Sequence, residues 1–263
     1  MSDRVSISLD GHVADVMLNR PEKYNALDMP MFEALGEAAD ELAKKPDLRA
    51  VVLHGAGDNF CAGIDIDVFT DPQLRIDKTL MAPIASSKAN LFQRAAYAWR
   101  ELPVPVICAL HGITFGGGLQ IALGADLRYA AADTRLSIME TKWGLIPDMA
   151  ISTTLRGVVP PDRVKELAWS ARVFDATEAL QLGIVTNIHD DPLSAAREFA
   201  QDCAARSPDA IRAIKQLVNE AWHLQEAESL ALEAKLQLGI MGLPNQVEAV
   251  RANLEKRPPR FAD

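Results

Sequence analysis

The feature that most restricts the fold is a run without Asp, Glu, Lys or Arg from Leu102 to Ala125. The run exceeds the about 20 residues that a membrane-spanning helix needs. It also contains Pro103, Pro105 and five glycines, three of them adjacent at 116–118, and an isolated spanning helix tolerates such residues poorly. A buried strand, a tight turn and a buried helix explain the same letters better. We therefore predict a buried strand–turn–helix unit and no membrane segment.

Patterns on both sides of this run predict strands that alternate with helices. Residues 5–9 and 12–18 alternate in polarity around Asp10-Gly11, which is typical of a hairpin with a two-residue turn. Asp28 precedes apolar residues at helical spacing and is a candidate N-cap. Helical pattern dominates from about Pro160 onward. Between these segments we expect short strands at 50–53, 104–110, 127–130 and 135–139. We also expect a mostly helical stretch at 70–101. The order predicts an α/β core with a helical tail.

Charge and cysteine content narrow the function classes. The 263 residues include 27 basic and 36 acidic side chains, for a net charge of −9. This balance argues against nucleic acid as the main ligand, although a few local cations can still hold one anionic small molecule. Cys61, Cys108 and Cys203 form no CxxC pair, so we expect neither a disulfide framework nor a metal site. The first residues resemble neither a signal nor a transit peptide, and we expect a cytoplasmic location.

Two glycine-containing segments are candidates for chemistry. Gly116-Gly117-Gly118 lies between an apolar strand and an apolar helix, where backbone amides and the helix dipole can stabilise negative charge on an oxygen. The alternative there is close strand–helix packing. The loop 60–66, FCAGIDI, can also present amides, and its alternative is an ordinary turn with Asp65 as an N-cap. Within it, Cys61 is interpreted as a small buried residue rather than a nucleophile.

Together these segments resemble the crotonase, or enoyl-CoA hydratase/isomerase, superfamily. The resemblance covers nearly the whole chain, in the order and spacing of the family. It rests on NRPEKYNAL (19–27), FCAGIDI (60–66), the segment 102–130, WGLIPD (143–148) and LEKRPPRF (254–261).

The resemblance implies the fold, the ligand and the assembly. Members have an α/β fold, a spiral of repeated ββα units with a C-terminal helical region. By this resemblance residues 1–200 are the spiral core and residues 201–263 are a C-terminal helical trimerisation region. Members bind acyl-CoA thioesters and form trimers or dimers of trimers. The resemblance implies no cofactor beyond the CoA moiety of the substrate.

The resemblance also implies binding residues. The amides of Ile64 and Gly117 match the two donors of the family's oxyanion hole. The residues that match the CoA-binding segments are Lys23, Tyr24, Ala62, Gly63, Ile64, Asp65 and Ile66.

The acid–base pattern departs from that of family hydratases, which carry two glutamates. The first position is Gln120 here, and a carboxamide can hold water but cannot relay a proton near neutral pH. The second position is retained as Glu140, whose apolar neighbours predict a raised pKa. The alternative for Glu140 is an ordinary surface residue. Asp148 matches an Asp of family dienoyl-CoA isomerases, and its alternative is capping of a following helix.

Three hypotheses follow. The first is an enoyl-CoA isomerase with Glu140 as base and Asp148 as possible partner. The second is an enoyl-CoA hydratase in which Glu140 and Asp148 share the proton transfers while Gln120 orients water. The third is an acyl-CoA-binding oligomer with little turnover. Trp143 is interpreted as a core or loop residue.

Overall fold

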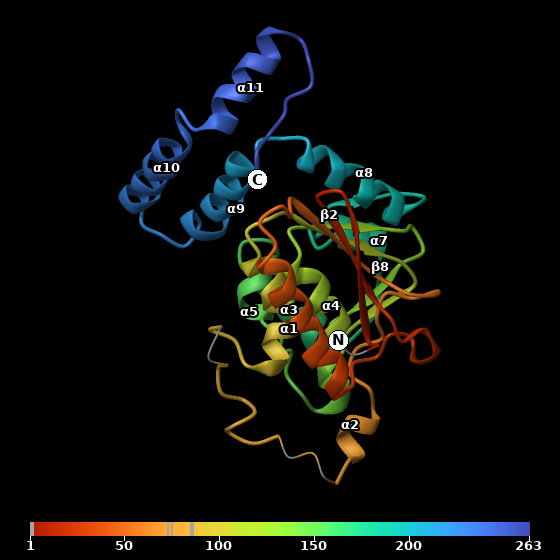
Figure 1. Cartoon of the computed structure of the whole chain (residues 1–263). Coiled ribbons are helices and arrows are strands. Elements are labelled where there is room, and N and C mark those ends of the chain that lie inside the picture. Colours follow the sequence, from red (N-terminus) through yellow and green to blue (C-terminus); the bar gives the residue numbers. More distant parts are fainter. Residues whose placement is uncertain (1–2, 73, 75, 85–86) are drawn as a thin grey trace.

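The computed structural model describes residues 3–72, 74, 76–84 and 87–263, and their strands form two sheets (Figure 1). The larger sheet has the order β1 (Val5–Asp10), β2 (Val13–Leu18), β3 (Ala50–Gly55), β4 (Val106–Leu110), β6 (Leu127–Ala130) and β9 (Asn187–Ile188). The smaller sheet has the order β5 (Ile113–Phe115), β7 (Arg135–Ser137) and β8 (Phe174–Asp175).

From β4 to β7, consecutive strands alternate between the two sheets. The chain runs from β4 to β5, continues through α4 (Gly117–Gly124), and then runs from β6 to β7. β4 pairs in parallel with β6, and β5 pairs in parallel with β7, so one ββα turn stacks on the next. This is the spiral α/β fold that the resemblance implies. It brings the loop after β3 and the start of α4 to neighbouring positions.

The N-terminal hairpin is confirmed, with one difference in its turn. β1 and β2 pair antiparallel, and Asp10 lies opposite Val13. The two turn residues are therefore Gly11 and His12, one position later than expected. Gly11 adopts a φ of +58°, a conformation that glycine takes without steric cost.

Helices cover both faces of the larger sheet (Figure 1). One face packs against α1 (Met29–Ala43), α3 (Leu91–Glu101) and α4, with Phe32 and Trp99 fully buried. The predicted cap of α1 is confirmed, because Asp28 accepts a hydrogen bond from the Met31 amide. The other face packs against α8 (Pro192–Ala204), whose buried alanines leave little distance between helix and strands.

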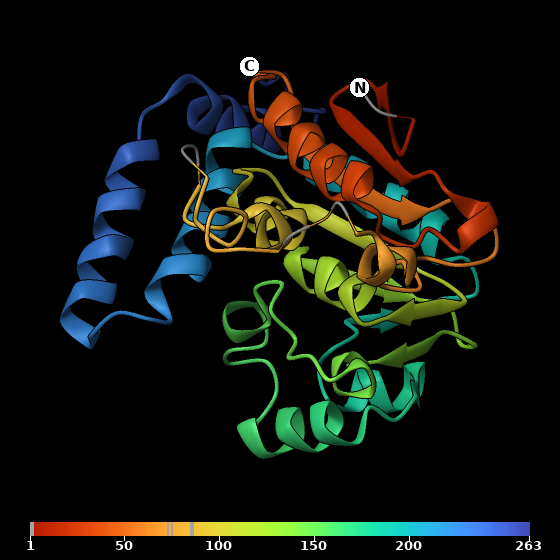
Figure 2. The ribbon, with the colours of Figure 1, turned by 90° about the horizontal axis from the view of Figure 1, so that it is seen from below.

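The remaining helices lie at the edges of this core. They are η1 (Pro21–Lys23), α2 (Asp67–Thr70), η2 (Glu140–Trp143), α5 (Ile151–Thr154), α6 (Pro161–Ser170), α7 (Ala176–Gln181), α9 (Pro208–Ala221), α10 (Glu226–Ile240) and α11 (Pro244–Leu254). Figures 1 and 2 show α10 and α11 projecting from the core as an arm. Residue 200, the expected end of the core, lies within α8. In the described ranges no helix combines the length and apolarity that crossing a bilayer requires.

The sequence prediction was wrong in two segments. The stretch 70–101 was expected to be mostly helical, but α2 ends at Thr70, α3 begins at Leu91, and the described residues between them form no helix. Polar turn residues and prolines interrupt this stretch until Asn90 starts α3 with a capping box. The run 102–125 was predicted as a strand, a turn and a helix, but the chain forms a second strand, β5, between β4 and the start of α4 at Gly117.

Gly124→Ala tests the close packing of α4 on α3. A Cβ at Gly124 would overlap the carbonyl oxygen of Ala96, so the substitution should cost about 1–3 kcal/mol of unfolding free energy. The matched control is Gly239→Ala in α10, where a Cβ would meet no atom within 4 Å. That change should stabilise the helix by about 0.5–1 kcal/mol. Urea unfolding measures the free energy of unfolding of both variants, and equal changes in the two would contradict the close packing of α4 on α3.

Candidate active site

A largely apolar pocket of about 700 Å³ opens beside the start of α4. Its walls come from the loop after β3, from α4, from η2 with the segment that follows it, and from α1 and α3. The polar groups that line the pocket include the side chains of Gln120, Glu140 and Asp148. A few convergent polar groups in an apolar cleft are typical of a small-molecule site.

The backbone amide of Ile64, on one wall of the pocket, takes no part in the local backbone bridge. Leu27 and Ile64 form a parallel bridge, in which the Leu27 amide donates to the Gly63 carbonyl at 2.8 Å. The Asp65 amide donates in turn to the Leu27 carbonyl at 3.0 Å. The bridge uses the Gly63 carbonyl and the Asp65 amide, on either side of Ile64, and leaves the Ile64 N–H outside it.

The second amide belongs to Gly117, the first residue of α4. The first N–H groups of a helix have no acceptor within the helix. Gly63 has a φ of +91°, and a Cβ there would lie 2.8 Å from the Phe115 carbonyl oxygen and 3.5 Å from the Gly117 nitrogen. The segment that carries Ile64 therefore passes directly against the start of α4. Two amides on facing segments are suited to donate to one oxygen that gains negative charge.

Glu140 lies at the start of η2 and lines the pocket. Its Oε1 accepts a hydrogen bond from Gln120 Nε2 at 2.5 Å. Its Oε2 is buried, and no described residue hydrogen-bonds to it. Burial raises the pKa of Glu140, and the nearby Asp148 acts in the same direction. Hydrogen bonds from the backbone amides of Glu140 and Met139 and from the Gln120 side chain act in the opposite direction. The predicted direction of this pKa shift is confirmed, and Glu140 is not an ordinary surface residue.

Gln120 lies in the middle of α4 and is almost fully buried. Its Oε1 accepts a hydrogen bond from the Met149 amide at 2.8 Å. The side chain thus joins Glu140 to the segment just after Asp148.

Asp148 is half-buried on the pocket wall, and burial raises its pKa. The alternative interpretation of Asp148 as a helix cap is wrong, because the N-cap of α5 is Ala150. The structure therefore brings Gln120, Glu140 and Asp148 to one pocket.

The residues expected to contact CoA are only partly on this pocket. Lys23 and the segment 62–66 line it, whereas Tyr24 is exposed and is not among the lining residues. Asp65 accepts a hydrogen bond from the Asp67 amide at 3.1 Å and forms an ion pair with Arg20 at 2.6 Å. Its carboxylate therefore stabilises the turn into α2, close to the capping role considered from the sequence, although Ile66 is the N-cap.

Cys61 is confirmed as a small buried residue. It has no exposed surface, and its Sγ donates to the Asn25 carbonyl at 3.1 Å. Burial raises the pKa of this thiol to about 12, so it carries no thiolate near neutral pH.

Sequence reasoning missed the aromatic residues of the pocket. Phe69 and Trp143 stack with their ring centroids 6.3 Å apart, and both rings are partly exposed. Phe32 and Phe92 meet edge to face at 5.0 Å in the buried part of the wall. The interpretation of Trp143 as a core or loop residue missed its place on the pocket. The signal available in the sequence was its place three residues after Glu140.

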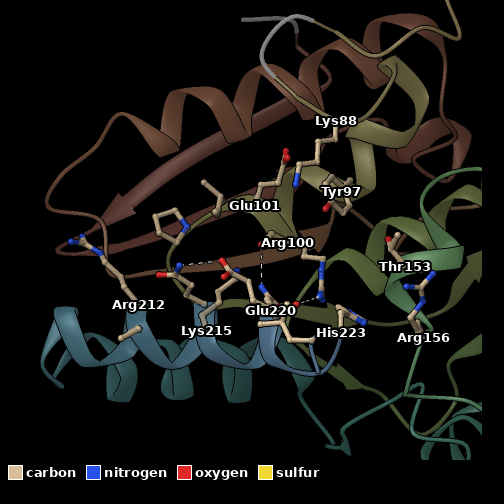
Figure 3. Close-up of a pocket in the computed structure, with 16 residues that line it drawn as sticks. Lys88, Tyr97, Arg100, Glu101, Thr153, Arg156, Arg212, Lys215, Glu220 and His223 are labelled. Carbon is tan, nitrogen blue, oxygen red and sulfur yellow. Dashed lines mark hydrogen bonds between the residues drawn. The ribbon is translucent and has the colours of Figure 1, made fainter. Parts of the chain in front are cut away.

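A second cleft, of about 740 Å³, lies between α3, α5 and α9 (Figure 3). Lys215 is buried there, and its ammonium group donates to the carbonyls of Trp99 and Val104 and to the Asp126 carboxylate. Arg212 donates to two backbone carbonyls just before β3. These cations satisfy carbonyl groups and hold α9 against the core. The candidate active site is therefore the pocket beside α4.

Comparisons with known proteins agree with this fold. The family model described as Enoyl-CoA hydratase/isomerase matches residues 9–263. The mitochondrial Delta(3,5)-Delta(2,4)-dienoyl-CoA isomerase of Mus musculus is 32% identical over 265 residues, which cover 95% of this chain and 79% of that protein. Enoyl-CoA hydratase EchA19 of Mycobacterium tuberculosis is 30% identical over 253 residues, which cover 95% of this chain and 93% of that protein. A solved enoyl-CoA hydratase from Bacillus anthracis aligns with a TM-score of 0.88 at 28% identity, covering 98% of both chains.

The spiral of ββα turns and the pocket beside α4 define a protein of the crotonase class. The chain belongs to the enoyl-CoA hydratase/isomerase family, and it is an enzyme of that family. Relatives of similar identity carry isomerase and hydratase names, so identity alone does not select the reaction.

Glu140→Gln should raise the free energy of unfolding at neutral pH. Burial raises the pKa of Glu140 above its ordinary 4.5, so the charged form is disfavoured in the native state. This cost is absent below the ordinary pKa and grows as the pH rises through the higher native value. The variant and the wild type should therefore differ little near about pH 4 and most at about pH 8. Urea unfolding at a series of pH values measures the difference.

Glu248→Gln is a control of opposite sign. Arg257 donates to Glu248 at 2.6 Å and lowers the pKa of this carboxyl from 4.5 to about 2. The charged form then contributes stability above 4.5, which is lost as the pH falls toward 2. This variant should be less stable than the wild type at neutral pH. A Glu140→Gln variant that loses stability in the same way would contradict the buried, unpaired Oε2.

Proposed function

We propose that this chain is an enoyl-CoA isomerase, which shifts a double bond of an enoyl-CoA thioester through an enolate. The observation that carries the proposal is Glu140, a largely buried carboxylate on the pocket whose Oε2 no described residue hydrogen-bonds. The first glutamate position of family hydratases holds Gln120 here, which donates to the other oxygen of Glu140. One carboxylate is sufficient to move a proton between two carbons of the same substrate.

The amides of Ile64 and Gly117 would bind the thioester oxygen. When the C2–H bond breaks, its electron pair moves into conjugation with the carbonyl and negative charge grows on that oxygen. Two fixed N–H donors in a dry pocket favour this state over the ground state, and loss of one such donor typically costs about 3 kcal/mol of barrier.

Glu140 would act as the base. Its carboxylate takes a proton from C2 of a 3-enoyl thioester and returns it to C4, which leaves the double bond between C2 and C3. With a 3,5-dienoyl thioester the proton returns to C6, and Asp148 is the partner for that more distant transfer. A raised pKa suits a group that both takes and returns the proton near neutral pH.

A hydratase is the second candidate function. The observation that favours it is the electrostatic coupling of Asp148 to Glu140, which provides two carboxyl groups on one pocket wall. In this case the two carboxyl groups would share water activation and C2 protonation while Gln120 orients water.

The CoA moiety is proposed to lie along Lys23 and the segment 62–66, with no cofactor beyond it. Lys23 lies at the exposed edge of the pocket and offers a cation to an anionic group. The cytoplasmic location stays a prediction.

A comparison of three substrates tests the function. The purified protein is offered 3-enoyl-, 3,5-dienoyl- and 2-enoyl-CoA, and absorbance and product mass are followed. We expect products of unchanged mass from the first two substrates. Glu140→Gln should lower this activity about 10²–10⁴-fold, because it removes the proton-transfer group.

Glu37→Gln on the exposed side of α1 serves as the matched control and should retain full activity. Addition of 18 Da to 2-enoyl-CoA without any isomerisation would replace the first proposal by the hydratase. Tight binding of all three thioesters without product would support a binding protein with little turnover.

We also propose that the chain assembles as a homotrimer or a dimer of trimers. Helix α9 and the arm of α10 and α11 expose many large apolar side chains: Ile214, Val218, Trp222, Leu230, Leu238, Met241, Leu243, Val247, Val250 and Leu254. Apolar surface on this scale typically marks a protein–protein interface.

Sedimentation equilibrium tests the assembly. We expect a mass of about three or six times the chain mass of 28.6 kDa. Leu238→Glu combined with Leu254→Glu should lower the mass, because charge on an apolar interface opposes association. Leu9→Glu on the exposed hairpin is the control and should leave the mass unchanged. A wild-type mass near that of one chain would end this proposal.

A further inference from the structure

Gln120 contacts both segments that carry the carboxylates of the pocket. Its Nε2 donates to Glu140 Oε1 at 2.5 Å, and its Oε1 accepts from the Met149 amide at 2.8 Å, next to Asp148. Only 1% of Gln120 is exposed, so water does not compete freely for these bonds. The sequence suggested Gln120 as a holder of water, whereas the structure gives it two protein partners.

The two partners determine how the carboxamide is oriented. A carboxylate only accepts hydrogen bonds and a backbone N–H only donates them. The nitrogen of Gln120 must therefore face Glu140, and its oxygen must face Met149. A side chain with two donors, two acceptors or no polar atoms would lose at least one of these bonds.

The bond to Glu140 has a geometric and an electrostatic effect. It holds Oε1, and the other oxygen is left buried without a described partner. Because the donor is neutral, it favours the charged carboxylate and opposes the effect of burial on the pKa. A carboxylate at position 120 would instead add a like charge beside Glu140 and favour its protonated form.

The bond to Met149 acts on the segment that carries Asp148. The backbone of this segment is constrained, because Ala150 has a φ of +67°, which is unusual for a residue with a Cβ. The Met149 sulfur also packs against Gly117, 2.9 Å from where a Cβ on that glycine would lie. The Gln120 carbonyl therefore helps to hold both Asp148 on the pocket wall and Met149 against the start of α4.

We infer that Gln120 is a positioning residue that orients the proton-transfer groups from both of its ends. Its nitrogen fixes the orientation of the Glu140 carboxylate, and its oxygen holds the Asp148 segment in place. The part of this inference that concerns turnover rests on the proposed function. The part that concerns ionisation of Glu140 does not, since it can be measured without substrate.

Gln120→Met tests the inference, because methionine has a similar length and neither hydrogen bond. We expect kcat to fall about 10- to 100-fold, with KM changed by no more than about threefold. The rising limb of the pH–rate profile should move to higher pH, because Glu140 loses a donor that favours its charged form. A residue that only fills space would not move this limb.

Gln201→Met is the matched control. Gln201 is an exposed glutamine of α8 that also donates to a carboxylate, that of Asp10, at 3.2 Å. Its replacement should change neither kcat nor the pH profile. If Gln120→Met behaves like this control, the inference is overturned.

A titration of the free protein separates the inference from the proposed function. Carbon-13 NMR of labelled glutamate, with Glu140→Gln to assign the signal, follows the carboxyl of Glu140. We expect a higher titration midpoint in Gln120→Met than in the wild type. An unchanged midpoint overturns the inference, whereas a wild type without turnover defeats only the proposed function.

Gln120→Glu keeps the test open if Gln120→Met does not fold. Glutamate has nearly the same shape, and the two neighbouring carboxyl groups should titrate as a pair in two steps, one of them well above the wild-type midpoint. A single midpoint at the wild-type value would show that position 120 does not act on Glu140.

Discussion

The close approach of the loop 60–66 to the start of α4 is the constraint on which the site depends. Gly63 passes so near to Phe115 and Gly117 that a methyl group would not fit. Two parallel bridges, Leu27 with Ile64 and Cys61 with Thr114, hold the loop in this position. The spiral fold makes the approach possible, because it places the loop after β3 beside the turn after β4.

A group of partly buried ion pairs ties this loop to the segment 19–28. Arg20 pairs with Asp65 at 2.6 Å and lies near Asp28, which also binds Arg4. The segment 19–28 is thereby tied to both the loop and the cap of α1. Removal of a single partner from such a group leaves an uncompensated buried charge, so the network restricts the loop to one arrangement.

The place of Glu140 in the pocket lowers the stability of the folded chain. No described residue hydrogen-bonds to Oε2 of Glu140, an arrangement that costs folding free energy and accompanies the raised pKa of this carboxyl. Gln120 offsets part of this cost with a neutral donor. In the proposed reaction, a carboxamide rather than a carboxyl group at position 120 leaves Glu140 as the single base beside the two backbone amides. This distinguishes the pocket from that of a two-glutamate hydratase.

The sequence by itself determined the alternation of strands and helices, the hairpin, the cap at Asp28 and the family, because these depend on local periodicity, turn residues and motif spacing. It also placed Glu140, Asp148 and the two amides as candidates. It did not determine the path of 71–90, the stacking of Phe69 on Trp143, or the partners of Gln120. Only the tertiary structure decided these. A contact between residues distant in the chain depends on how helices and strands pack, and no local pattern of side chains encodes the distance across a pocket.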